Sequence, residues 1–208
     1  KWVPMKTRLT LTALACIAAA LCVPAAKAEV SAQTIKNLNA AFQGESNASN
    51  RYAKFAEKAE ADGFPEVAKL FRATSASEAI HRDNHKKAIL DLGGKVETFE
   101  LEAVVPGTTA DNLKAAIKGE TYEQTTMYPE FLAVAKKDDA RAAMRTLEFA
   151  METEKAHAKL YQAALESLGK PGAVNYFVCG VCGMTVPELP AKKCSVCRKS
   201  RDEYKKID

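Results

Sequence analysis

Most of this sequence has no net charge. The 208 residues include 30 Lys and Arg against 26 Asp and Glu, and the excess lies in four basic residues before residue 29, where no acidic residue occurs. Residues 29–208 therefore have equal numbers of acidic and basic side chains. Nucleic acids and anionic membranes are bound through clustered positive charge, so this balance argues against both as partners.

Long apolar runs are almost absent as well. The one run, Leu9–Val23, has the length of the apolar region of a signal peptide and is too short to span a bilayer comfortably. Ala26-Lys27-Ala28 then has the form of a signal peptidase site. We therefore expect residues 1–28 to be a signal peptide and the remaining chain to be exported to the periplasm without a membrane attachment. An uncleaved anchor is the alternative, and the lack of an arginine pair favours the general secretory route.

Cysteine is absent from residues 29–178, and glycine and proline, which interrupt helices, are scarce up to residue 168. Four long stretches of this region have apolar residues at helical spacing. Gly93-Gly94 ends the second stretch, Pro129 predicts a kink in the third, and Asp138-Asp139 is placed to open the fourth. The predicted helices cover residues 32–61, 66–92, 110–137 and 138–168, and a long connection over residues 95–110 lets the chain cross the end of a four-helix bundle.

Histidine is scarce, with three residues in the chain, yet two of them occur in the same local motif. Each half of the predicted bundle has one glutamate on its first helix and Glu-x-x-His on its second, 33 residues later in the first half and 34 in the second. This repeat comprises Glu45, Glu78, His81, Glu120, Glu154 and His157. One such motif would be expected by chance on a solvent face, but two copies at matched offsets indicate a common site.

The positions of these glutamates predict a metal site. All four fall in the apolar stripes of their helices, and residues three apart on a helix share a face. A buried carboxylate without a partner costs several kcal/mol or takes up a proton. Two divalent cations would neutralise the four carboxylates, and carboxylates with one imidazole per metal suit iron or manganese better than zinc or copper. The same donor set is known from carboxylate-bridged di-iron bundles.

The two halves differ in ways that bear on the site. Glu123 follows Glu120 by three residues, where the first half has Ala48, and adds a fifth glutamate to one metal. Tyr52 and Tyr128 are placed to hydrogen-bond the carboxylates or to pack in the core. We expect His85, one turn after His81, to lie beside the site or at an interface and not to be a ligand.

Two Cys-x-x-Cys pairs, separated by eleven residues, form a tetrathiolate motif in the tail. Its members are Cys179, Cys182, Cys194 and Cys197. Iron and zinc both fit this spacing. Two disulfides are the other possibility, but bridges within Cys-x-x-Cys are strained and redox-active, which makes them poor structural cross-links. We expect residues 171–208 to form a small metal-binding domain with short strands.

Together these residues resemble the rubrerythrin family over essentially all of residues 29–208. The resemblance implies a mainly α fold: a ferritin-like di-iron four-helix bundle over residues 29–170, followed by a rubredoxin-like Fe(Cys)4 domain over 171–208. It further implies that Glu78 and Glu154 bridge two irons and that Glu45 and Glu120 are terminal ligands. His157 would bind one iron. The other iron would exchange Glu123 for His81 when the site is reduced.

The resemblance also implies an activity, reduction of hydrogen peroxide to water in oxidative-stress defence, with electrons passed through the Fe(Cys)4 centre. In the family the two centres commonly belong to different subunits, which implies a homodimer or larger homo-oligomer. Export would place cytosolic nicotinamide donors out of direct reach, so the electron donor is unidentified. The alternatives are a ferroxidase or iron store, which would not need the tail, and an electron carrier or zinc-stabilised interaction module.

Overall fold

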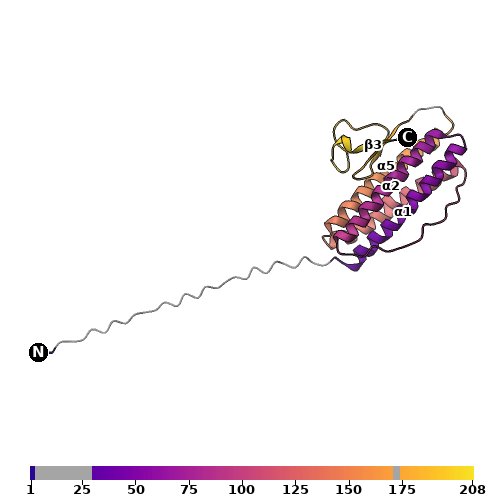
Figure 1. The fold of residues 1–208 in the computed structure, drawn as a ribbon. Helices are drawn as coiled ribbons and strands as arrows, with labels where there is room; N and C mark the ends of the chain where they lie inside the picture. Colours follow the sequence, from indigo (N-terminus) through magenta and orange to yellow (C-terminus); the bar gives the residue numbers. More distant parts are fainter. Residues whose placement is uncertain (3–29, 171–173) are drawn as a thin grey trace.

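The computed structural model describes residues 1–2, 30–170 and 174–208, so nearly all of the predicted signal peptide lies outside the described residues. Four long helical segments run side by side, and a small sheet lies against them near α2 and α5 (Figure 1). The helices are α1 (Ala32–Ala61), α2 (Pro65–Asp91), α3 (Thr109–Tyr122), α4 (Tyr128–Lys137) and α5 (Arg141–Glu166), with a π-helical segment η1 (Glu123–Met127) joining α3 to α4. None of the helices described is both long and apolar enough to cross a membrane.

The turn before α5 differs from the prediction that Asp138-Asp139 opens the fourth helix. Asp138 instead ends α4, with its amide donating to the carbonyl of Val134. Asp139 has a φ of 45°, and α5 begins at Arg141. The Asp138 carboxylate accepts hydrogen bonds from the amide of Ser31 (3.0 Å) and the hydroxyl of Thr34 (2.6 Å). It is therefore used to hold the start of α1 and is not available to cap α5.

The third predicted helix also differs in detail. A kink at Pro129 was expected, whereas the structure has a π-helical turn immediately before that residue. The amide of Tyr128 donates to the carbonyl of Glu123, five residues back, and Pro129 then occupies the first turn of α4, where its missing N–H costs little. The π-helical turn therefore accommodates one extra residue next to the predicted site. Such turns are frequent at functional sites.

The long connection between α2 and α3 runs along α1, as a crossover in the bundle requires. Asn39 accepts from the amide of Glu97 (2.9 Å) and donates to the carbonyl of Lys95 (3.0 Å), and Asn47 accepts from the amide of Glu102 (3.1 Å). These side chains replace the backbone partners that an irregular segment lacks. The connection is thereby held against the bundle.

Two apolar clusters fill the bundle, and the Glu/His repeat lies between them along the helices. One cluster contains the packed aromatic rings Tyr52, Phe55, Phe71 and Tyr161. The other includes Leu38, Ile89, Tyr128 and Leu147. Polar residues that separate two such clusters on every helix would be costly without a compensating charge.

The C-terminal sheet has the order β2-β1-β3, with both pairs antiparallel. Its strands are β1 (Tyr176–Cys179), β2 (Thr185–Val186) and β3 (Tyr204–Ile207), and a short 3-10 helix η2 (Arg201–Glu203) precedes β3. Tyr176 and Val178 of β1 are buried against the aromatic cluster of the bundle. The predicted mainly α fold, with a bundle of helices followed by a small domain of short strands, is observed.

Candidate metal centres

The six residues of the Glu/His repeat converge in the middle of the bundle. Each has at most 1% of its surface exposed. Their ligand atoms form two overlapping groups, each within 4.8 Å, and Glu78 and Glu154 belong to both. One group adds Glu45 and His81, and the other adds Glu120 and His157. Four helical segments therefore present a donor set with twofold internal symmetry.

The distances show how the two shared glutamates are oriented. Glu78 places Oε2 at 3.0 Å from Nδ1 of His81 and Oε1 at 3.1 Å from Nδ1 of His157. Glu154 places Oε1 at 3.0 Å from Nδ1 of His81 and Oε2 at 2.9 Å from Nδ1 of His157. Each carboxylate thus directs one oxygen to each half of the site, as a bridging carboxylate must.

The donor atoms fit a pair of cations. Among the described residues, eight buried side-chain nitrogen and oxygen atoms have no hydrogen-bond partner, and all eight belong to the repeat. They are Glu45 Oε2, both oxygens of Glu78 and of Glu154, Glu120 Oε2, and Nδ1 of His81 and His157. Such a concentration of unpaired acceptors in a dry interior is unfavourable unless metal ions bind them.

The electrostatics of the site lead to the same conclusion. Burial, together with the negative charge of Glu78, raises the pKa of Glu120 to about 8 and also raises the pKa of Glu154. Burial alone would raise the pKa of Glu45, but the imidazoles of His81 and His85 outweigh it and lower that pKa. Without a cation, the carboxylates cannot all be ionised at neutral pH, because each one opposes the ionisation of the next.

Two tyrosines connect the halves of the site. The hydroxyl of Tyr52 donates to Glu120 Oε1 at 2.5 Å, and that of Tyr128 donates to Glu45 Oε1. Each tyrosine therefore holds a carboxylate of the opposite half. In both glutamates the bond occupies Oε1 and leaves Oε2 without a partner. Both tyrosines also pack in the apolar clusters of the bundle, so the hydrogen bonding and the core packing considered from the sequence are both observed.

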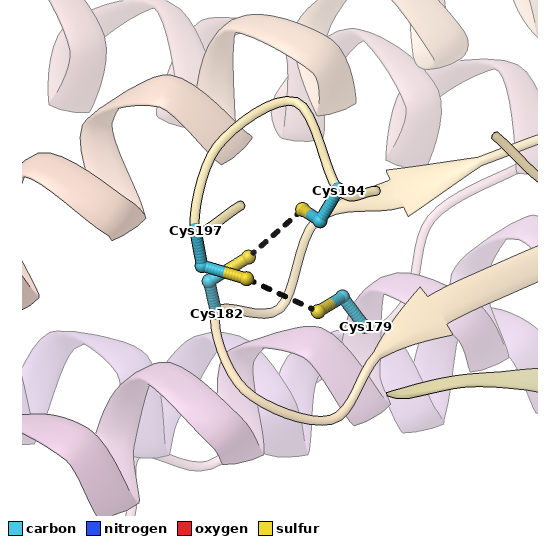
Figure 2. Close-up of side chains that lie close together, drawn as sticks. All are labelled: Cys179, Cys182, Cys194 and Cys197. Atoms are coloured by element: carbon cyan, nitrogen blue, oxygen red, sulfur yellow. Dashed lines mark hydrogen bonds between the residues drawn. The ribbon is translucent and has the colours of Figure 1, made fainter. Parts of the chain in front are cut away.

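The four cysteine sulfurs also converge (Figure 2). The Sγ atoms of Cys179 and Cys197 are 3.7 Å apart, and those of Cys182 and Cys194 are 3.6 Å apart. A disulfide requires about 2.0 Å, whereas tetrahedral metal–sulfur bonds of about 2.3 Å separate neighbouring sulfurs by about 3.8 Å. Hydrogen bonds from Cys182 and from nearby backbone amides lower the pKa of Cys179 to about 5. The cluster fits a metal and not two disulfides.

Comparison with known proteins identifies this combination of centres. The family model described as Rubrerythrin matches residues 36–165. Rubrerythrin-2 of Clostridium acetobutylicum is 35% identical over 178 residues, covering 83% of this chain and 96% of the relative. The chain belongs to the rubrerythrin family. Nigerythrin of Nitratidesulfovibrio vulgaris is 30% identical, covering 82% and 85% of the two chains.

Solved structures agree with this assignment. A mixed-valence state of nigerythrin superposes with a TM-score of 0.77 at 27% identity, covering 88% of this chain and 94% of that one. Bacterioferritin BfrA of Mycobacterium tuberculosis, with a TM-score of 0.62 at 21% identity, shares the bundle fold alone. As a rubrerythrin-family member, this chain is a di-iron oxidative-stress protein whose bundle and cysteines have the donors of a di-iron site and an Fe(Cys)4 site.

Glu123 differs from the other predicted ligands of this rubrerythrin-family site. It lies in the π-helical segment, is only partly exposed, and belongs to neither converging group, whereas His81 does. Burial and the nearby carboxylates, Glu45 foremost, raise the pKa of Glu123 well above its usual value. Glu123 is therefore close enough to interact electrostatically with the site carboxylates, although it belongs to neither converging group.

His85 lies beside the site in a fully buried position. Its Nδ1 is 3.0 Å from the hydroxyl of Thr146, and its Nε2 is 3.3 Å from the hydroxyl of Tyr128. The expected position next to the site is therefore observed. The contribution of Thr146 was missed, because an isolated threonine on an amphipathic helix gives no sequence signal.

The other feature that the sequence did not reveal is contact between the two centres of one chain. The carbonyl of Cys182 lies 3.0 Å from Nε2 of His81, and the hydroxyl of Thr185 lies 3.0 Å from Nε2 of His157. The family resemblance implied that the centres exchanging electrons belong to different subunits. In this structure the cysteine domain lies directly on the di-iron residues of its own chain.

Proposed function

We propose that this protein reduces hydrogen peroxide to water, with electrons supplied through its Fe(Cys)4 centre. Each peroxide consumes two electrons and two protons and yields two waters, with cleavage of the O–O bond. The observation that carries this proposal is the 3.0 Å contact between the carbonyl of Cys182 and the imidazole of His81. An iron store would gain nothing from a thiolate centre held against its di-iron site.

The donor geometry supports specific roles for the residues of the bundle. Glu78 and Glu154 would bridge the two metals, because each directs its two oxygens to different halves of the site. His81 and His157 would bind through Nδ1, which faces those oxygens. Glu45 and Glu120 would be terminal ligands. When bound, the two irons supply the two-electron redox change that peroxide reduction requires.

The protein's own contribution is to hold these donors in a dry and rigid arrangement. Tyr52 and Tyr128 bind Oε1 of Glu120 and Glu45, which orients the free Oε2 of each carboxylate toward the site. Exclusion of water strengthens every charge interaction in the site. Glu123 provides an additional carboxylate, and we propose that it replaces His81 when the oxidation state changes.

We also propose that residues 1–28 direct export to the periplasm and that the protein acts there as a homodimer or larger oligomer. The donor that reduces the Fe(Cys)4 centre would then have to be a protein or small molecule of that compartment. Within residues 29–208 the equal numbers of acidic and basic residues give no indication of a nucleic-acid partner.

A stopped-flow experiment tests the peroxidase proposal. Residues 29–208 are purified, loaded with iron without oxygen, and reduced; we expect about three irons per chain and oxidation of the reduced protein by one equivalent of peroxide per two electrons. Peroxide should react much faster than oxygen. The proposal is wrong if peroxide reacts slowly while added ferrous iron and oxygen load the protein well beyond three irons per chain, which is the behaviour of an iron store.

A further inference from the structure

The segment from Val181 to Thr185, hereafter the first knuckle, is hydrogen-bonded to the two helices that carry the Glu-x-x-His motifs. On α2, Asn84 donates to the carbonyl of Val181 (2.9 Å) and Ser77 to the carbonyl of Gly183 (2.7 Å). On α5, Thr153 donates to the carbonyl of Cys182 (3.3 Å), and two further bonds reach the histidines themselves, at His81 and His157. The first knuckle therefore contacts the outer nitrogen of both imidazoles of the di-iron site.

The partners fix the tautomer of each histidine. The carbonyl of Cys182 can only accept a hydrogen bond, so Nε2 of His81 must carry the proton. The hydroxyl of Thr185 donates its own proton to the carbonyl of Gly183 at 3.1 Å, so it accepts from Nε2 of His157. In the neutral form of both rings, which is the form that binds a metal, Nδ1 keeps a free lone pair that faces the carboxylates of Glu78 and Glu154.

Gly183 makes this approach possible. Its φ of +80° is unfavourable for other residues, and a Cβ at this position would lie 2.4 Å from Nε2 of His81 and 2.7 Å from Oγ of Ser77. Both are buried groups held by other contacts. The contact between the first knuckle and α2 therefore requires glycine at position 183.

We propose that the cysteine domain positions both di-iron histidines of its own chain, and that a folded, metal-filled cysteine site thereby strengthens metal binding in the bundle. Hydrogen bonds to the outer nitrogen of a metal-bound histidine orient the ring, and losing one typically costs about 10-fold to 100-fold in metal affinity. This inference rests on the di-iron assignment and is independent of which oxidant the site reduces.

The test measures metal binding and not catalysis. The cysteine site is first filled with zinc, and the bundle is then titrated with Co²⁺, whose visible absorption reports its ligands. We expect Thr185→Val to lower the affinity of the bundle for Co²⁺ at least about 10-fold, and Thr185→Ser, which retains the hydroxyl, to restore it. Wild-type affinity in Thr185→Val would overturn the role of Thr185.

Two further variants examine the knuckle as a unit. Gly183→Ala should weaken Co²⁺ binding more than Thr185→Val, because it displaces both contacts. Gly63→Ala is the matched control, since Gly63 has a φ of +82° but a Cβ there meets no atom within 4 Å. The variant Cys194→Ser/Cys197→Ser, which cannot fill the cysteine site, should also bind Co²⁺ more weakly in the bundle. Equal affinity in all of these variants would contradict the coupling.

A mixing experiment decides whether the knuckle acts on its own chain. Thr185→Val is unfolded and refolded together with Glu78→Ala/Glu154→Ala, whose bundle is inactive but whose knuckle is intact. Action within one chain predicts that the mixture binds Co²⁺ no more tightly than Thr185→Val alone. Recovery of tight binding would show that the knuckle reaches the partner chain instead and would overturn the assignment to one chain.

Discussion

At the scale of single residues, tyrosine hydroxyls determine which oxygen of a site carboxylate is left free for a metal. Tyr52 and Tyr161 are both fully buried and belong to the same aromatic cluster, but only Tyr52 bonds a site carboxylate. The hydroxyl of Tyr161 lies 2.5 Å from that of Thr74. This pair allows the effect of a bond to a ligand to be separated from the effect of losing a buried hydroxyl.

We expect Tyr52→Phe and Tyr161→Phe each to lower the free energy of unfolding by about 1 kcal/mol, because each removes one buried hydrogen bond. Only Tyr52→Phe should weaken iron binding in the bundle, by about 10-fold, since it frees Oε1 of Glu120. Urea unfolding and competition with a chelator measure the two quantities. Equal iron affinities in the two variants would show that Tyr52 has only a packing role.

Sequence reasoning was most successful where a pattern repeats. The six-residue Glu/His repeat and the two Cys-x-x-Cys pairs supply ten of the eleven predicted ligands, and the structure brings all ten into its converging groups. Glu123 is the one left outside. Its placement depends on a π-helical turn, and a hydrophobic pattern of period 3.6 does not reveal where one extra residue is inserted.

At the scale of the helix, this π-helical segment places Glu123 near the site without adding it to the converging groups. Because His81 already belongs to the converging group that contains Glu45, Glu123→Ala should leave iron content largely unchanged. If Glu123 replaces His81 during turnover, the same variant should reduce peroxide about 10-fold or more slowly. Glu130→Ala, an exposed glutamate on α4, is the control. Unchanged turnover in Glu123→Ala would show that no such exchange is needed.

Other helix-scale features depend on tertiary contacts that no local pattern contains. Asp138 is a residue type that often begins a helix, yet its carboxylate accepts hydrogen bonds from the beginning of α1, more than one hundred residues earlier in the chain. The docking of the first knuckle is similar, since it depends on backbone carbonyls and on the missing side chain of Gly183. Sequence patterns predicted the two domains but not the surface that joins them.

At the scale of the whole molecule, protons and metal ions compete for the same buried carboxylates and imidazoles. The folded, metal-free chain holds Glu120 with a pKa of about 8, whereas an unfolded glutamate titrates near pH 4.3. The pKa values of His81 and His157 are also raised, because burial, which opposes this, is outweighed by the nearby carboxylates. The raised pKa values of Glu123 and Glu154 add to this effect, and the lowered pKa values of His85 and Cys179 oppose it. Because more groups have raised than lowered pKa values, the folded chain binds more protons than the unfolded chain between about pH 5 and 8.

It follows that the metal-free protein should lose stability as the pH rises through this range. Each additional proton bound by the folded state contributes a slope of up to about 1.4 kcal/mol per pH unit. Glu45, whose pKa is lowered, contributes in the opposite direction only below this range. Metal binding requires deprotonated ligands, so the iron-loaded protein should not show the decline.

Urea unfolding from pH 5.5 to 8, with the bundle's metal first removed by a chelator, measures this slope. Glu120→Gln cannot titrate, so it should unfold with a shallower pH dependence than the wild type and should be the more stable of the two at pH 8. A flat profile in the metal-free wild type would mean that the carboxylates are compensated without metal. The two cations would then not be what makes four buried glutamates tolerable in this bundle.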